Sequence, residues 1–428
     1  MDIINQLAEI EPGGRLDEVR NLRPKAKQNA QATFTALLEP EDTGAFSYAE
    51  RYAVAAFVAG LFQVPAAAEF YLDLLGDAAA DDIVAAVRQA TDRGATRGPA
   101  HDAGFVTFQD IDGADARLSA AFDFAHLLVF HPQDARPAAL GHLEEAGWDA
   151  DGIVSLAQLI AFLAFQVRVV HGLRVLGGKG DPAGNTAGKN EAANVTEVES
   201  AGADSTSPGW HVAGDVIVPE VHAPEGFVNH SLGWKPWIPA VAKEDMTPQQ
   251  IDALIKPERV DSEYFRLLAR DPEALRARTE TDLDIFYNTD GGMARAEREL
   301  AAAVVSRLNG CAYCASVHQA RCVDEGGDRE VVDRLLDEGV DTDLGSDYWS
   351  AIRNAAVALT RTPSEFTAKH IDAVRAAAPG AAAVSPGTES AGHADAVVID
   401  LINCSSFFNW ANRLMLTLGE PDVPRRFR

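Results

Sequence analysis

The first 310 residues of this chain contain no cysteine. All four cysteines follow, at Cys311, Cys314, Cys322 and Cys404. A secreted fold held together by disulfides would use more cysteines and would spread them along the chain. In a reducing compartment, two cysteines close in sequence are more often catalytic or metal-binding than structural. The cysteine content therefore argues against a disulfide scaffold and makes Cys311 and Cys314 the first candidate site.

Basic residues are also scarce. Lys and Arg number 37 against 64 Asp and Glu, which gives a formal net charge of −27 and a pI of about 4.7. An acidic surface repels phosphate backbones and anionic lipid headgroups. We therefore expect neither nucleic acid nor a membrane surface as a partner, and we interpret the acidic surface as an aid to solubility.

Long apolar runs and targeting signals are missing as well. The N-terminal sequence MDIINQLAEIEPGGRLDEVR lacks the basic start and apolar core of a secretion signal. The most apolar runs, Ala53–Ala68 and Ile153–Phe165, fall short of the roughly 18–20 clean apolar residues of a membrane span, which predicts buried core helices. No glycine-rich phosphate loop occurs, so no nucleotide, flavin or haem cofactor is expected. These features predict a cytoplasmic protein.

The composition favours helices. Hydrophobic residues make up 47% of the chain, Ala is abundant and aromatics are few, which is typical of packed helices. Residues Gly177–Pro208 are poor in large apolar side chains and rich in Gly, Ala, Ser and Asn, which predicts a flexible linker. Residues Trp210–Pro239 contain several prolines and three tryptophans and predict an extended arm with a short strand. The expected organisation is a helical domain over 1–176, linker and arm over 177–240, and a second helical domain over 241–428.

The two helical blocks resemble each other. The segment SYAERYAVAAFVAGL, ending at Leu61, parallels MARAERELAAAVVSRL, ending at Leu308. Two further pairs follow in the same order: residues 118–147 with 348–377, and residues 159–173 with 401–415. Three ordered matches predict an all-α protein built from two tandem copies of one helical domain.

Residues 297–322, ERELAAAVVSRLNGCAYCASVHQARC, contain the candidate chemistry. Apolar spacing predicts a helix up to Leu308, Asn309-Gly310 predicts a C-cap and turn, and a second helix is expected from near Cys311 to about Glu325. Cys314 and His318 are four residues apart and therefore share one helix face.

These residue types suit thiol redox chemistry. The positive end of a helix stabilises a thiolate, the nucleophilic form of cysteine. A His one turn further along can relay a proton, and a carboxylate from the preceding helix can orient that His. A second Cys three positions away can form a disulfide once the first has become a sulfenic acid.

The spacing of Glu299, Cys311, Cys314 and His318 resembles the E-x11-C-x-x-C-x3-H signature of the AhpD-like alkylhydroperoxidases, within the carboxymuconolactone decarboxylase-like superfamily. The resemblance covers residues 280–420 and, more weakly, 40–175. It implies a peroxidatic Cys314, a resolving Cys311 and a proton relay of Glu299 and His318. It also implies an organic hydroperoxide substrate, a dithiol reductant protein and a homo-oligomer, dimer or trimer. The chain departs from well-known members at Tyr313, where they often have His; Tyr313 can still donate a hydrogen bond.

The N-terminal copy lacks this site. When Leu61 is aligned with Leu308, Tyr52 stands at the position of Glu299, Val64 and Ala67 at the two cysteines, and Tyr71 at the histidine. No thiol chemistry is possible there, so a structural role as packing partner is expected for this half.

Several alternatives stay open. The Cys311/Cys314 pair could hold a structural zinc, but zinc normally needs four ligands and no second such pair occurs. Glu297 is an alternative carboxylate to Glu299 on a different helix face. Cys322 and Cys404 are expected to be buried core thiols, and the cluster Asn409, Trp410, Asn412 and Arg413 lines either the substrate pocket or a buried interface. The competing functions are a carboxymuconolactone decarboxylase-type lyase, whose members generally lack the CxxC pair, and a non-enzymatic redox sensor or disulfide partner.

Overall fold

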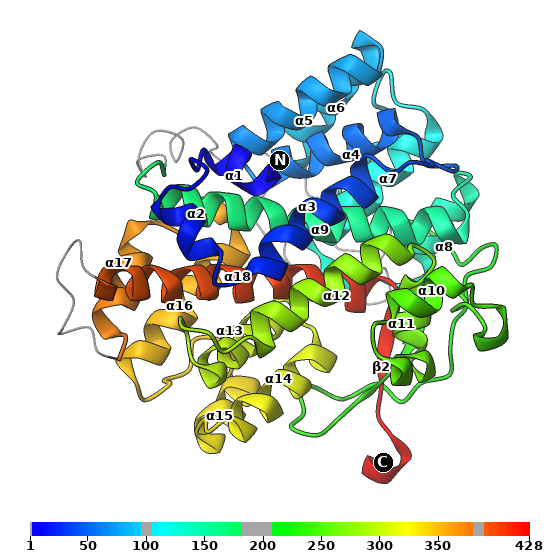
Figure 1. The fold of residues 1–428 in the computed structure, drawn as a ribbon. Coiled ribbons are helices and arrows are strands. Elements are labelled where there is room, and N and C mark those ends of the chain that lie inside the picture. The colour runs from blue at the N-terminus through cyan, green and yellow to red at the C-terminus, as the bar shows by residue number, and fades with distance from the viewer. Residues whose placement is uncertain (1, 96–104, 181–207, 380–388) are drawn as a thin grey trace.

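The computed structural model describes residues 2–95, 105–180, 208–379 and 389–428, with side chains from residue 392 onward in the last range. Nearly all regular structure in these ranges is helical, which confirms the predicted all-α fold (Figure 1). Buried apolar side chains from both halves of the chain form a continuous core. Most of the predicted linker, residues 181–207, lies outside the described residues. The division into domains at 176 and 241 stays a prediction.

The helices before the linker are α1 (Ile3–Ala8), α2 (Arg15–Arg20), α3 (Pro24–Leu38), α4 (Tyr48–Leu61), α5 (Pro65–Ala78), α6 (Asp81–Gly94), α7 (Ala116–Phe130), η1 (Pro132–Asp134), α8 (Pro137–Glu145) and α9 (Ala150–Leu176). Those after it are η2 (Lys243–Asp245), α10 (Pro248–Ala253), η3 (Pro257–Asp261), α11 (Glu263–Leu268), α12 (Pro272–Tyr287), α13 (Arg295–Leu308), α14 (Ala312–Asp324), α15 (Arg329–Glu338), α16 (Asp347–Arg361), η4 (Pro363–Glu365), α17 (Ala368–Ala377), α18 (Glu389–Thr417) and η6 (Arg425–Phe427). The strands are β1 (Gly233–Pro236) and β2 (Gly419–Asp422).

The two longest helices, α9 and α18, pack against each other through the middle of the molecule (Figure 1). Among the described residues, α9 is the one helix long and apolar enough to cross a membrane by length and composition, but 94% of its most apolar window is buried inside the protein. The prediction of a core helix over residues 153–165 is therefore confirmed. The shorter helices pack around this central pair, with α3 against α12 and α4 against α9.

The helices fall into two series with the same order. The series α3, α4, α5, α6, α7, η1, α8, α9 is matched by α12, α13, α14, α15, α16, η4, α17, α18. Matched members have similar lengths: α4 and α13 both contain 14 residues, and the final helices contain 27 and 29. The matching order of helices is consistent with a duplication, which stays a prediction.

One arginine in each series makes the same contacts. Arg51 on α4 donates through Nε to the carbonyl of Phe46, five residues earlier, at 2.8 Å. Arg298 on α13 donates through Nε to the carbonyl of Met293, also five residues earlier, at 2.7 Å. The guanidinium of each also reaches a carbonyl near the C-terminal end of the preceding helix of its series. These hydrogen bonds hold the N-terminal part of each helix against the chain segment that precedes it. Arg51 and Arg298 stand at matching positions when Leu61 is aligned with Leu308.

A second pair of buried arginines joins the two series. Arg168 on α9 donates to the carbonyl of Thr360 at the end of α16, at 2.8 Å. Arg413 on α18 donates to the carbonyl of Val129 at the end of α7, at 3.0 Å. Each side chain satisfies carbonyls that the end of a helix leaves free, in the opposite half of the chain. The sequence alignment paired Arg168 with Trp410; these contacts instead favour a register three residues later, with Arg413.

The segment after the linker follows the surface and returns to the core at β1. Strand β1 pairs antiparallel with β2, with Gly233 opposite Asp422 and Pro236 opposite Gly419. The indole of Trp234 donates to the carbonyl of Met415 at 2.9 Å, which anchors the arm to the end of α18. The predicted arm with a short strand is confirmed.

Replacing Arg168 with Met should destabilise the fold strongly. The change removes charged hydrogen bonds to two buried carbonyls of α16, so the free energy of unfolding should fall by about 3 kcal/mol or more. Arg174→Met is the matched control on the same helix, because Arg174 pairs with the exposed Glu9, and it should cost less than about 1 kcal/mol. Urea unfolding followed by circular dichroism measures both; equal losses would contradict the bridging role.

Candidate active site

The candidate site lies where α13 turns into α14. Helix α13 ends at Leu308, Asn309 is its C-cap, and Gly310 follows with φ +80°. Only glycine adopts this conformation easily, and a Cβ here would also clash with Oε1 of Gln133. Cys311 then forms the N-cap of α14, and Cys314 lies in the first turn of that helix. The predicted helix–glycine turn–helix is confirmed, with its boundaries within one or two residues.

Glu299 and His318 contact each other across this turn. The fully buried carboxylate of Glu299 is hydrogen-bonded through Oε2 to Nδ1 of the buried His318. Its other oxygen accepts from Nε of Arg295, one turn earlier on α13, at 2.6 Å. Because a carboxylate can only accept, Nδ1 of His318 carries the proton and Nε2 is the nitrogen left for proton exchange.

The charge of Glu299 is stabilised by these two partners. Burial raises the pKa of the carboxyl, but the charges and hydrogen bonds of His318 and Arg295 together outweigh burial and hold this pKa below its ordinary value of 4.5. The carboxylate is therefore ionised at neutral pH although it is buried. The ring of His318 is fixed by Phe408 of α18, whose centroid lies 4.1 Å away in an edge-to-face arrangement.

The other carboxylate of α13 is directed elsewhere. Glu297 accepts a hydrogen bond from the indole of Trp349 on α16 at 3.4 Å. It lies on a different face of α13 from Glu299, as the helical spacing predicts. The carboxylate that contacts His318 is therefore Glu299.

Both cysteines of the pair are buried thiols in the reduced state. Burial raises the pKa of Cys311 well above the ordinary value of 9.0, and the neighbouring Cys314 raises it further, while Asn412 opposes the rise. Cys311 is therefore a protonated thiol at neutral pH. Cys314, in the first turn of α14, lies at the helix end that favours negative charge.

A buried amide network lies behind Cys311. Asn309 donates to the side-chain oxygens of Asn409 and Asn412 at 3.3 and 3.1 Å, and Asn412 donates to the hydroxyl of Ser306 at 3.0 Å. Of the polar cluster predicted at the end of α18, Asn409 and Asn412 thus connect α18 to the turn before Cys311. Arg413 of that cluster bonds to Val129 in the other half, so these side chains have the buried interface role that was one of the two alternatives.

The two remaining cysteines are buried, as expected. The thiol of Cys322 lies 3.3 Å from the carbonyl oxygen of Ala296, and burial together with Glu299 and Glu297 raises its pKa to about 12. Burial raises the pKa of Cys404 well above its ordinary value. Neither thiol has an environment that would favour a thiolate at neutral pH.

In the N-terminal series an uncharged pair occupies the matching position. Tyr71 is hydrogen-bonded through its hydroxyl to Oε1 of Gln166 on α9, and burial raises the pKa of this tyrosine far above its ordinary value. Val64 and Ala67, at the positions matching the cysteines, are buried in the core. This half therefore has no group that titrates near neutral pH at the matching position.

Sequence reasoning missed Arg295, which supplies a second hydrogen-bond partner of Glu299. The spacing Arg295–Glu299 is an i,i+4 pair on one helix, so the signal was present. Phe408 could not have been assigned from sequence, because its contact with His318 depends on how α18 crosses α14. Among the described residues, no cluster of three or more His, Cys, Asp or Glu side chains is arranged to hold a metal ion.

Residues 272–362 match the carboxymuconolactone decarboxylase family. The chain contains an AhpD-like domain of this family. The match covers α12 to α16 and so includes Glu299, both cysteines of the pair and His318. No curated protein matches the chain.

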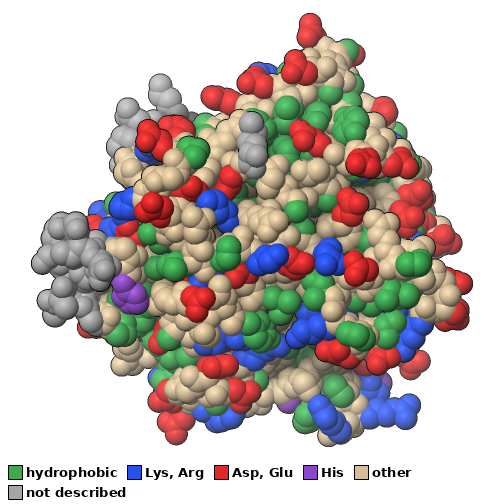
Figure 2. Space-filling model, in the orientation of Figure 1, with side chains coloured by type: hydrophobic (Ala, Val, Ile, Leu, Met, Phe, Trp, Pro, Cys, Tyr) green, Lys and Arg blue, Asp and Glu red, His purple; other side chains and the backbone are tan. Residues whose placement is uncertain are grey.

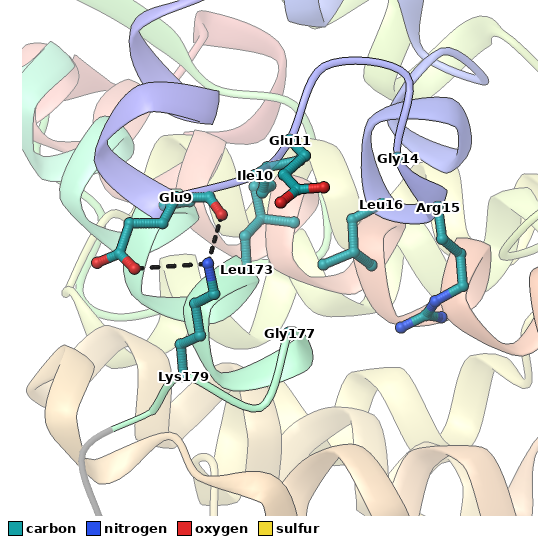
Figure 3. A pocket seen from close by; sticks show the side chains of 10 residues that line it. Glu9, Ile10, Glu11, Gly14, Arg15, Leu16, Leu173, Gly177 and Lys179 are labelled. Atoms are coloured by element: carbon teal, nitrogen blue, oxygen red, sulfur yellow. Dashed lines mark hydrogen bonds and ion pairs between the residues drawn. The ribbon is translucent and has the colours of Figure 1, made fainter.

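A surface pocket of about 200 Å³ lies between the N-terminal segment of the chain and the end of α9 (Figure 3). Its lining does not include the cysteines. Lys179 is its one lysine, and Figure 3 shows its ammonium bound to both the carboxylate and the backbone carbonyl of Glu9. Because that cation is already paired, we assign the pocket no role.

The stability of the AhpD-like domain should depend on pH through Glu299. Because its folded pKa is lowered, its ion pairs stabilise the fold fully above pH 4.5, and this contribution is lost as pH falls through the lowered value. Glu299→Gln should therefore cost about 1.5–3 kcal/mol at neutral pH and progressively less in acid. Unfolding by urea across this pH range measures the difference. The exposed Glu325→Gln is the control, and a cost for Glu299→Gln that stays constant into acid would contradict the ion pair.

Proposed function

We propose that this protein is a thiol-dependent peroxidase that reduces organic hydroperoxides through Cys314 and Cys311. The observation that carries the proposal is the contact between the ionised Glu299 and Nδ1 of His318, one helical turn from Cys314. This pair gives His318 a fixed orientation and a free Nε2 on the helix face that also bears Cys314. The resemblance of the spacing of Glu299, Cys311, Cys314 and His318 to the AhpD-like signature supports the same chemistry.

The first half-reaction oxidises Cys314. Its thiolate sulfur attacks the terminal oxygen of the hydroperoxide, the O–O bond breaks, and the sulfur becomes a sulfenic acid. The alkoxide that leaves takes a proton from the relay of His318 and Glu299 and departs as an alcohol. Because Cys311 stays a protonated thiol, it is a poor nucleophile toward the peroxide, and we assign it the role of resolving thiol.

The second half-reaction closes the disulfide. The sulfur of Cys311 attacks the sulfenic sulfur of Cys314, an S–S bond forms, and the hydroxyl leaves as water. One hydroperoxide and two thiols thus yield one alcohol, one water and one disulfide. A dithiol protein must then reduce the disulfide, so the proposed cycle needs such a partner.

A lyase is the second candidate, because the matched family is named for a decarboxylase. In that reaction Glu299 and His318 would serve as a proton-transfer pair and the thiols would not change oxidation state. A redox sensor would form the disulfide without rapid turnover. Peroxide-dependent chemistry at the cysteines distinguishes these functions from the proposed one.

Mass mapping of the thiols after stoichiometric cumene hydroperoxide tests the proposal. We expect the wild type to lose two of its four thiols and to yield a Cys311–Cys314 disulfide, with turnover sustained by an added dithiol. Cys314→Ser should abolish the loss, while Cys322→Ser, which removes a thiol outside the pair, should leave the disulfide intact. Four unreacted thiols in the wild type would contradict the peroxidase function and leave the lyase as the remaining candidate. A disulfide that forms only slowly, without turnover, would favour the sensor.

A further inference from the structure

Arg278 on α12 is buried, with 6% of its surface exposed, yet no hydrogen bond or ion pair joins it to any residue in the described ranges. Its Nε is buried without an acceptor. Every other buried arginine in those ranges donates to carbonyl or carboxylate oxygens or to a side-chain amide, namely Arg20, Arg23, Arg51, Arg168, Arg298 and Arg413. Arg278 is therefore an exception that needs a physical explanation.

A buried guanidinium is costly unless its N–H donors are satisfied. It has five N–H donors in a planar fork. Three aromatic rings surround it: its central carbon lies 5.1 Å from the centroid of Phe407, 5.9 Å from that of Trp410 and 5.8 Å from that of Tyr264. These rings attract the charge, but they do not replace hydrogen-bond acceptors.

Two of these aromatic residues have unsatisfied polar atoms of their own. The hydroxyl of Tyr264 on α11 and the indole N–H of Trp410 on α18 are buried and have no partner among the described residues. Each of three helices thus contributes one buried N–H or O–H donor that has no acceptor in the described ranges, and the rings of Tyr264 and Trp410 lie within 6 Å of the Arg278 guanidinium. Such a set is complementary to a ligand that carries acceptor oxygens and negative charge.

The surrounding charges are mixed, with a second cation close by. Burial lowers the pKa of the partly buried Arg259, Asp282 raises it, and Arg278 lowers it, which places both groups within electrostatic range of Arg259. Asp282 lies one turn after Arg278 on α12 but forms no ion pair with it. Several Lys and Arg side chains also lie around α12 on the face shown in Figure 2, although the chain as a whole is strongly acidic.

This donor cluster lies near the Glu299–His318 pair. Burial raises the pKa of Tyr264, Arg278 lowers it, and Cys314 and Tyr313 raise it further. Phe407, which packs against Arg278, is followed by Phe408, which packs against His318. Phe286 contacts both sides, with its ring centroid 6.1 Å from that of Phe407 and 5.8 Å from that of His318, so the cluster lies close to His318.

We propose that Arg278, Tyr264 and Trp410 form an anion subsite that binds a carboxylate group of the substrate. The substrate class is then an organic hydroperoxide that also carries a carboxylate. A single buried guanidinium matches a monovalent planar anion, which it can bind with two parallel hydrogen bonds. The aromatic rings match the hydrocarbon part of such a molecule. This inference rests on the proposed peroxidase function for the reaction, but not for the binding of the anion.

Calorimetric titration of the reduced full-length protein with octanoate tests the subsite without any peroxide. Octanamide, which has the same chain without the charge, is the ligand control. We expect octanoate to bind the wild type, and Arg278→Gln to weaken binding about 10-fold or more because a charged hydrogen-bond pair is lost. The matched protein control is Arg276→Gln on the same helix, because Arg276 is paired with Asp252 at the surface; it should bind octanoate like the wild type.

Tyr264→Phe provides a second variant that should fold normally, since its hydroxyl has no partner to lose. It should weaken octanoate binding several-fold. Equal octanoate affinity in the wild type, Arg278→Gln and Tyr264→Phe, or equal binding of octanoate and octanamide, would overturn the subsite. Normal octanoate binding in a protein whose thiols ignore hydroperoxides would leave the subsite in place and contradict only the peroxidase.

Discussion

The buried contact between Glu299 and His318 is the interaction on which the account of this site depends. A carboxylate that is removed from solvent keeps its charge only if partners compensate for burial, and Arg295 and His318 do so, each at a different carboxylate oxygen. The contact joins α13 to α14 across the glycine turn and fixes the ring on the same helix face as Cys314. The proposed roles of His318 and Cys314 both depend on this contact.

The two halves of the chain share a framework but differ at this position. Arg51 and Arg298 fix the entry to matching helices, and Arg168 and Arg413 each cap a helix of the opposite half. At the position of His318 the first half instead has Tyr71, bound to the neutral Gln166. The helical framework therefore does not itself require a charged pair at this position.

Local features of this site could be predicted from sequence. The capping pattern at Asn309-Gly310 and the four-residue spacing of Cys314 and His318 depend only on neighbours along the chain, and the structure has both. Glu299 could be preferred over Glu297 because helical spacing puts them on different faces. Contacts between distant helices could not be predicted in this way. The contacts of Arg168 and Arg413 favour a register for α9 and α18 three residues later than the sequence alignment gave. The environment of Arg278 depends on how α11, α12 and α18 come together.

The most direct test of the central claim is to trap the first oxidised state. The Cys311→Ser variant lacks the proposed resolving thiol, so a sulfenic acid formed by cumene hydroperoxide should persist and react with dimedone. Peptide mass mapping then identifies the residue that bears the adduct. The account predicts an adduct on Cys314 alone, and none on Cys314 when Glu299 is also replaced by Gln and exposure is brief. An adduct on Cys322 or Cys404, or no adduct at all, would contradict the claim that Glu299 and His318 support a peroxide-reactive Cys314.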